Sequence, residues 1–151
     1  MGVHVLLAKI RLLVTVVVLV SSAALGCSFQ SRTPSPNKTL QVSMDDVLHK
    51  DNITQNVTLG VGNTLTVKLG SNYSTPYRWQ ADARIGDSSI VRQSGHRYVQ
   101  PTTDRMGAPG TEVWTFDALK PGTTTVTTYY SSFVGKDSKP ACTYTAIVTV
   151  Q

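Results

Sequence analysis

The chain has 151 residues, of which 40% are hydrophobic, and this is enough for one domain with its own core. Its formal net charge is +5. Two cysteines are too few for a disulfide-stabilised scaffold, and the absence of a basic cluster excludes a typical nucleic-acid binder. No spacing of His, Cys or carboxylate residues is typical of a zinc or calcium site, so we expect no metal and no cofactor.

The first 26 residues have the pattern of a secretory signal peptide. A basic start is followed by an apolar run from Leu12 to Val20 and by small residues at 21–26. The apolar run is shorter than the roughly 20 residues that a membrane-spanning helix needs. We therefore assign residues 1–26 to a signal peptide rather than to a transmembrane helix.

The next motif, Ala24-Leu25-Gly26-Cys27, resembles a bacterial lipobox, although Ala24 stands where leucine is usual. In a lipobox the cysteine is lipidated and becomes the new amino terminus, which predicts a lipoprotein anchored in a bacterial cell envelope and facing outward. Residues 27–38 contain prolines and serines without alternation, so they predict a flexible tether behind that anchor. The alternative is an ordinary cleaved signal with Cys27 nearby by chance, which predicts secretion.

The second cysteine, Cys142, has no partner if Cys27 carries lipid. A lone cysteine on a strand is usually a small buried hydrophobic residue. Nothing in the sequence brings Cys142 together with His49 or His96 and an orienting group, so a thiol catalyst is not predicted. We expect the protein not to be an enzyme.

Residues 39–151 predict a single all-β domain. Leu40 to Leu48 is ambiguous, because its alternation gives way to two aspartates. Further along, short alternating stretches separated by turn residues predict strands at 53–59, 64–69, 77–83, 90–99, 111–116, 123–130 and 143–150. About seven such strands are typical of an immunoglobulin-like antiparallel β-sandwich, with loops at 70–76, 101–110 and 131–140.

The stretch from Arg105 to Phe116 joins a Gly-x-x-Gly loop directly to an alternating strand. Gly107 and Gly110 permit a positive φ or close backbone approach, and Pro109 stiffens the turn between them. A rigid loop on a packed strand can present its backbone to a partner, although many such loops are simple turns. From Thr111 onward, alternation places three side chains on one face: Glu112, Trp114 and Phe116.

Three segments, taken in order, carry a resemblance to a known family. Residues 72–79 read NYSTPYRW, residues 106–116 read MGAPGTEVWTF, and residues 129–133 read YYSSF. They resemble the loops of the chagasin family of cysteine-peptidase inhibitors, whose first loop reads Asn-Pro-Thr-Thr-Gly-Tyr-x-Trp. The family's second loop has Gly-x-x-Gly before Thr-Glu, and its third reads Arg-Pro-Trp. The resemblance extends over roughly residues 57–150.

The resemblance implies an immunoglobulin-like sandwich whose three loops plug the active-site cleft of a papain-like cysteine peptidase. Such a protein is a non-enzymatic inhibitor, and we expect a monomer. Thr75 corresponds to the position nearest the catalytic cysteine of the peptidase. Carried over by position, the expected peptidase-binding residues are Asn72, Ser74, Thr75, Pro76, Tyr77, Gly107, Ala108, Pro109, Gly110, Ser131, Ser132 and Phe133. Trp79 and Trp114, each in mid-strand, are expected in the core.

The loops also depart from the family pattern. Tyr73 replaces proline and Pro76 replaces glycine in the first loop, while Ser131, Ser132 and Phe133 replace Arg-Pro-Trp in the third. The changes in the third loop predict a weak or narrowly selective inhibitor, because serine lacks the planar donor set of arginine. An alternative function is an envelope lipoprotein interaction module that reuses the sandwich to bind a non-peptidase envelope or phage protein.

Overall fold

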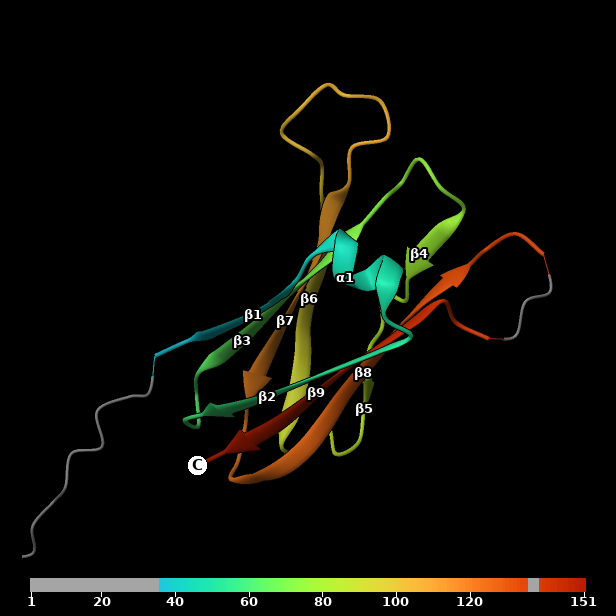
Figure 1. Ribbon diagram of the computed structural model, residues 1–151. Helices are drawn as coiled ribbons and strands as arrows, with labels where there is room; N and C mark the ends of the chain where they lie inside the picture. Colours follow the sequence, from blue (N-terminus) through green and yellow to red (C-terminus); the bar gives the residue numbers. More distant parts are fainter. Residues whose placement is uncertain (1–35, 136–138) are drawn as a thin grey trace, which may run out of the picture. The chain divides into compact units, whose positions relative to one another are not determined.

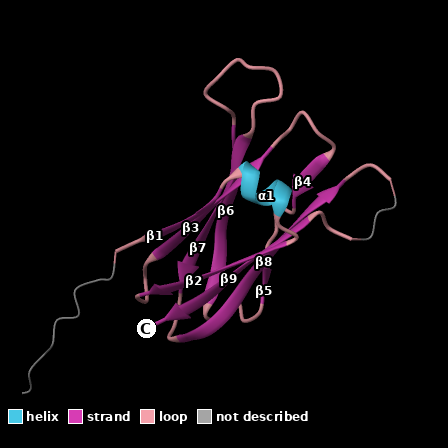
Figure 2. Cartoon of the chain, in the orientation of Figure 1, coloured by secondary structure: helices cyan, strands magenta, loops and turns pink. Residues whose placement is uncertain are grey.

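The computed structural model describes residues 36–135 and 139–151, which form two packed β-sheets and one short helix (Figures 1 and 2). The prediction of an all-β, immunoglobulin-like sandwich is confirmed. The predicted signal peptide and Cys27 lie outside the described residues. In the part of the chain that is described, no helix is long and apolar enough to cross a membrane.

The two sheets contain nine strands, compared with about seven expected from the sequence. The first sheet has, in spatial order, β1 (Lys38–Val42), β3 (Thr64–Ser71), β7 (Gly110–Ala118) and β6 (Val91–Val99). The second has β2 (Asn52–Leu59), β9 (Cys142–Val150), β8 (Gly122–Ser132) and β4 (Tyr77–Trp79), and the short β5 (Arg84–Ile85) also pairs with β8.

Both sheets are mixed, whereas the sequence predicted a purely antiparallel sandwich. β1 runs parallel to β3, and β2 runs parallel to β9; the other strand pairs are antiparallel. The parallel pairs join strands that no tight turn connects, as where Asn52 pairs with Thr143. Turn signals in the sequence define only neighbouring strands, so they do not reveal these pairs.

The ambiguous stretch at 40–48 divides between β1 and helix α1 (Met44–His49). Ser43 caps the helix, because its Oγ accepts a hydrogen bond from the Asp46 backbone N–H at 3.1 Å. Asp45 and Asp46 lie in the first turn, where their negative charges interact favourably with the positive end of the helix dipole. Val47 is the buried residue of α1.

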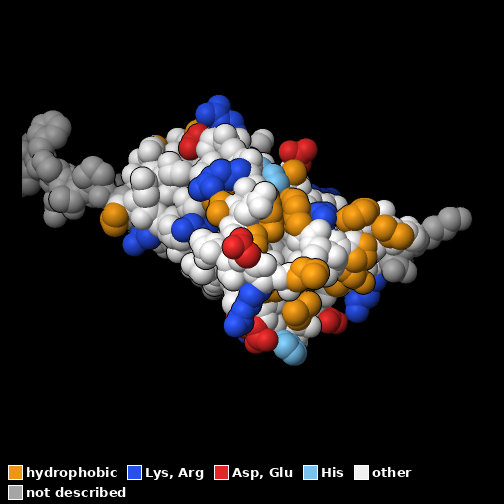
Figure 3. Space-filling view, turned by 90° about the horizontal axis from the view of Figure 1, so that it is seen from above, with side chains coloured by type: hydrophobic (Ala, Val, Ile, Leu, Met, Phe, Trp, Pro, Cys, Tyr) orange, Lys and Arg blue, Asp and Glu red, His pale blue; other side chains and the backbone are white. Residues whose placement is uncertain are grey.

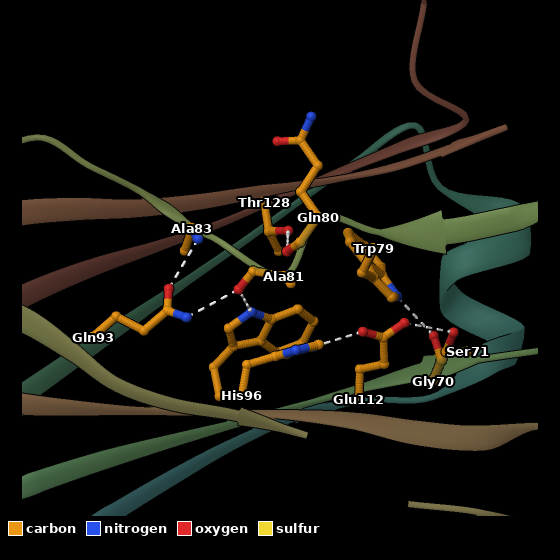
Figure 4. A network of polar contacts seen from close by, with 11 residues as sticks. Gly70, Ser71, Trp79, Gln80, Ala81, Ala83, Gln93, His96, Glu112 and Thr128 are labelled. Carbon is orange, nitrogen blue, oxygen red and sulfur yellow. Dashed lines mark hydrogen bonds and ion pairs between the residues drawn. The ribbon is translucent and has the colours of Figure 1, made fainter. Parts of the chain in front are cut away.

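The strand expected at 77–83 ends early, at Trp79 (Figure 4). The Gln80 N–H still donates to the Tyr129 carbonyl of β8 at 3.0 Å, but the carbonyls of Gln80 and Ala81 accept hydrogen bonds from side chains. The Trp114 indole N–H donates to the Ala81 carbonyl at 2.9 Å, and the Thr128 hydroxyl donates to the Gln80 carbonyl at 2.9 Å. Trp114 belongs to the first sheet and Thr128 to the second. The segment therefore ties the two sheets together.

The core lies between the two sheets and includes both tryptophans, as predicted. Trp79 and Trp114 are buried and meet edge to face, with ring centroids 6.5 Å apart. Cys142 is fully buried, and burial raises the pKa of its thiol to about 11. The prediction that it is a small core residue is confirmed. Other core residues include Leu65, Val67, Leu69, Phe116, Val126, Tyr144, Ala146 and Val148.

Candidate binding surface at the loop end

Three loops stand at the same end of the domain (Figure 1). The first loop, residues 72–76, joins β3 to β4; the second, residues 100–109, joins β6 to β7; and the third, residues 133–141, joins β8 to β9. The predicted site residues lie in these loops or at the strand ends beside them. The first loop passes from one sheet to the other, so both sheets contribute to this end of the domain.

The residues before and after the first loop are held by hydrogen bonds to buried groups (Figure 4). Before it, the Ser71 hydroxyl donates to Glu112 Oε1 at 3.0 Å, and His96 Nε2 lies 2.7 Å from Glu112 Oε2. After it, the Trp79 indole N–H donates to the Gly70 carbonyl at 2.9 Å. Glu112 is only 1% exposed, so its carboxylate is a buried acceptor satisfied by two partners. Both ends of the loop are thus attached to the core.

Within the first loop, Asn72 is the main hydrogen-bond acceptor. Its Oδ1 accepts from the Ser74 N–H at 3.0 Å and from the Ser74 hydroxyl at 2.7 Å. Its carbonyl accepts from the Thr75 N–H at 3.1 Å and from the Thr75 hydroxyl at 2.8 Å. None of residues 72–77 has a positive φ, so the path of the loop accepts Pro76 where the family has glycine.

Arg78, which follows the first loop on β4, points its guanidinium back at the loop. One terminal nitrogen, Nη1, donates to the carbonyls of Thr75 at 2.7 Å and Tyr77 at 2.6 Å. The other, Nη2, donates to the Tyr73 carbonyl at 3.0 Å. The guanidinium carbon also lies 3.9 Å from the ring centroid of Tyr73 and 5.1 Å from that of Phe133. Arg78 therefore contacts both the first and the third loop.

The second loop uses its two glycines in the two ways that the sequence predicted. Gly107 has a φ of +79°, and its carbonyl accepts a hydrogen bond from Asn72 Nδ2 at 3.0 Å, which ties the second loop to the first. Gly110 is buried at the start of β7, where a side chain would collide with Tyr98 and with the Val99 carbonyl. Gly107 thus provides a turn and Gly110 a close approach.

The third loop starts later than expected. Ser131 and Ser132 are the last residues of β8, where they pair with β4, because this ladder continues past the predicted end of the strand. The Phe133 N–H donates to the Pro76 carbonyl at 3.0 Å, which joins the third loop to the first. The Ser132 hydroxyl also donates to the Val134 carbonyl at 2.7 Å.

Apolar side chains gather at this end of the domain (Figure 3). Four large exposed ones come from the three loops: Tyr73 (41%), Phe133 (64%), Val134 (60%) and the fully exposed Met106. Burial raises the pKa of the Tyr73 phenol, and the negative charge of Glu112 adds to this effect. Apolar side chains that cluster on a surface are typical of an interaction site.

Metal-binding clusters and reactive cysteines are two features that the described residues can be checked for. Among residues 36–135 and 139–151, no three His, Cys, Asp or Glu side chains form a possible metal site. The Cys142 thiol is buried in the core, and its raised pKa is the opposite of what a nucleophile needs. The loop end instead presents exposed backbone and apolar side chains, which suit binding.

Comparison with known proteins identifies the family. The profile of the Chagasin family peptidase inhibitor I42 matches residues 58–148, which is more than half of the chain. The chain belongs to the chagasin family of peptidase inhibitors. The family resemblance predicted from the three loop segments is therefore confirmed. No curated protein matches the sequence.

Solved structures share the fold of this chagasin-family chain. The cysteine protease inhibitor EhICP2 from Entamoeba histolytica is 18% identical, with a TM-score of 0.58 over 76% of this chain and 96% of that one. PbICP-C, solved in complex with falcipain-2, is 19% identical, with a TM-score of 0.59 over 76% of this chain and 100% of its own. Amebosin is 19% identical, with a TM-score of 0.54 over 78% and 100%.

Two features of this surface were not identified from the sequence. The first is the buried carboxylate of Glu112 with its partners Ser71 and His96. The sequence placed Glu112 on the same face of the strand as Trp114 and Phe116, and because a buried carboxylate needs partners, that alternation could have prompted a search for them. Arg78 gave no such signal. The role of Arg78 depends on β4, which places this residue next to the preceding loop and close to Phe133, a residue much later in the sequence.

Proposed function

We propose that this chain inhibits papain-like cysteine peptidases by inserting the ends of its three loops into the active-site cleft. One observation supports this most: the three loops are joined before any partner is bound. Asn72 Nδ2 bonds to the Gly107 carbonyl, and the Phe133 N–H bonds to the Pro76 carbonyl. A preformed surface loses less conformational entropy on binding than three independent loops would.

Thr75 is the proposed central residue, nearest the catalytic cysteine. Its hydroxyl donates to the Asn72 carbonyl at 2.8 Å, and its own carbonyl accepts from Arg78 at 2.7 Å. A peptide bond held in this way resists the extended conformation in which peptidases bind and cleave substrates. The first loop would therefore occupy the cleft without being cut.

The other loops would contact the walls of the cleft. In the second loop, Gly107, Ala108 and Pro109 present backbone for pairing with the peptidase, while the buried Gly110 shapes the loop from beneath. In the third loop, Phe133 presents an exposed aromatic ring, the type of side chain that often anchors an interface.

The test is a titration of the purified protein against several papain-like peptidases. We expect reversible inhibition that competes with substrate, and an inhibitor chain that stays intact during prolonged incubation. Absence of inhibition, or steady cleavage within residues 72–76, would contradict the proposal. An affinity pull-down distinguishes inhibition from the main alternative function. Recovery of a peptidase would favour inhibition, whereas recovery of a non-peptidase envelope protein would favour an interaction module.

We also propose that lipid on Cys27 tethers the domain to a bacterial membrane. The near-lipobox at residues 24–27 supports this, as does the Ser- and Pro-containing stretch before β1. Cys27→Ser should release the protein from the membrane fraction and abolish labelling by a lipid precursor. An unlabelled and fully secreted wild-type protein would refute the anchor.

A further inference from the structure

We propose that Arg78 is the positioning residue of the three-loop surface. Its guanidinium holds the first loop in one conformation and joins it to the third loop, without itself binding the peptidase. The consequence for inhibition rests on the proposed function, whereas the effect on the conformation of the loops does not.

The polar contacts of Arg78 explain how one side chain can fix a whole loop. Its terminal nitrogens donate to the carbonyls of Tyr73 at 3.0 Å, Thr75 at 2.7 Å and Tyr77 at 2.6 Å, and the Asn72 carbonyl lies 3.5 Å from Nη1. These carbonyls come from the loop and from the first residue of β4, and they converge on one planar cation. Charge-assisted bonds are stronger than neutral ones, and lysine cannot reproduce the spread of a guanidinium.

Aromatic contacts extend this arrangement across all three loops. Tyr98, near the end of β6 and the start of the second loop, stacks on Tyr73 with ring centroids 3.7 Å apart and planes 10° apart. Tyr73 in turn contacts the Arg78 guanidinium at 3.9 Å, and Phe133 lies 5.1 Å from it on the third loop. Both distances are within the roughly 6 Å over which a cation is attracted to an aromatic ring.

The direction of these contacts distinguishes Arg78 from an arginine that binds a partner. Arg78 is only partly exposed, and both of its terminal nitrogens bond to the chain's own carbonyls. Loss of Arg78 should therefore act by reducing the fraction of molecules whose first loop has the binding conformation. Apparent affinity falls in proportion to that fraction, and the loss is seen mainly as slower association.

The experiment compares Arg78→Ala and Arg78→Lys with the wild type, and uses Arg84→Ala as the matched control. Arg84 is an exposed arginine on β5, so its removal changes net charge equally. The first measurement is hydrogen exchange of the backbone amides of Ser74, Thr75 and Tyr77. We expect at least 10-fold faster exchange in both Arg78 variants, with the core amides of β7 and β9 unchanged, and no effect in Arg84→Ala.

The second measurement is the association and dissociation rates with a peptidase that the wild type inhibits. We expect 10- to 100-fold weaker binding, mostly from slower association, and partial rescue of Arg78→Ala by millimolar guanidinium ion. If Arg78→Ala does not fold, the comparison with the wild type is made with Arg78→Lys alone, which keeps the positive charge.

Unchanged loop exchange in Arg78→Lys would overturn the proposal. If, in addition, the Arg78 variants dissociate from the peptidase faster than the wild type, the combination identifies Arg78 as a residue that contacts the peptidase directly. If the wild type inhibits no peptidase, the proposed function fails, and the exchange measurement alone then decides whether Arg78 positions the loops.

Discussion

The first and second loops lie side by side but are held in different ways. In the first, Ser74 and Thr75 both bond to Asn72, and Arg78 gathers the carbonyls. The second is longer, and its internal bonds are few: the Ala108 N–H donates to the Arg105 carbonyl at 3.1 Å, and a longer contact of 3.4 Å links the Arg105 N–H to Thr103.

This difference shows where the conformation of each loop comes from. The first loop is fixed by its own residues and by the strand that follows it. The second loop depends on its neighbour, because the Asn72 side chain binds the carbonyl of Gly107. The ordered surface is therefore built outward from the first loop, and four substitutions test that order.

The largest effect is expected from Glu112→Ala, which removes the support shared by both loops. Glu112 follows the second loop on β7 and bonds to Ser71, which precedes the first loop. The change leaves Ser71 and His96 without their buried acceptor and should cost about 3 kcal/mol of unfolding free energy. For a domain of this size, Tm falls by about 10–15 °C.

Chemical and thermal unfolding measure this loss. Glu112→Gln is the control, because it keeps the shape of the side chain and part of its hydrogen bonding, so it should lose less stability. A Glu112→Ala variant that melts with the wild type would show that the buried carboxylate does not support the loops.

Thr75→Arg should abolish inhibition while the fold stays intact. A long charged side chain at the centre of the first loop would be forced into the cleft and lose its hydration there. We expect a loss of more than about 100-fold in affinity, which is near 3 kcal/mol, with little change in Tm. Thr75→Val, which removes only the hydroxyl, separates steric blocking from loosening of the loop. Inhibition by Thr75→Arg at wild-type strength would place the first loop outside the site.

Asn72→Asp should release the second loop and leave the first in place. Aspartate keeps the oxygen that accepts from Ser74 but replaces the amide donor to the Gly107 carbonyl with a second oxygen. We expect about 5- to 10-fold weaker inhibition, as for loss of one hydrogen bond of about 1 kcal/mol. Hydrogen exchange should quicken at Gly107 and Ala108 but not at Thr75. Equal acceleration in both loops would contradict the dependence of the second loop on the first.

Ser131→Arg should weaken the surface slightly, even though the family has arginine at this position. Ser131 pairs directly with Arg78 across β4 and β8. Two like charges placed opposite each other on antiparallel strands are destabilising, here by about 0.5 kcal/mol. We expect a small fall in Tm and an affinity lowered by about 2- to 3-fold, whereas Ser131→Ala should be neutral. Tighter inhibition by Ser131→Arg would show that Arg78 leaves room for a second guanidinium.

The sequence predicted the strands whose two faces differ most. Residues 64–69 and 143–150 alternate between buried and partly exposed positions in the structure, because one face of each strand packs into the core. The sequence also located all three loops, since glycine, proline and asparagine mark turns through local backbone preferences.

What the sequence did not predict depends on contacts between distant residues. The early end of β4 is caused by side chains such as Trp114 and Thr128, which bind its continuation from other strands. The extension of β8 through Ser132 depends on pairing with β4. Arg78 likewise gains its role only after the loops have come together. Periodicity and turn chemistry describe local structure, and none of these features is local.

The place of β9 has a consequence for how the protein is made. β9 comes after the other eight described strands in the sequence, yet it lies between β2 and β8 in the second sheet. β2 therefore has no partner in that sheet until residues 142–150 have left the ribosome. Pairing of strands so far apart in the chain is slow, because a long segment must be ordered at once. The second sheet therefore closes only after residues 142–150 have been synthesised, and a chain that stops before Cys142 carries two unpaired strand edges that favour aggregation.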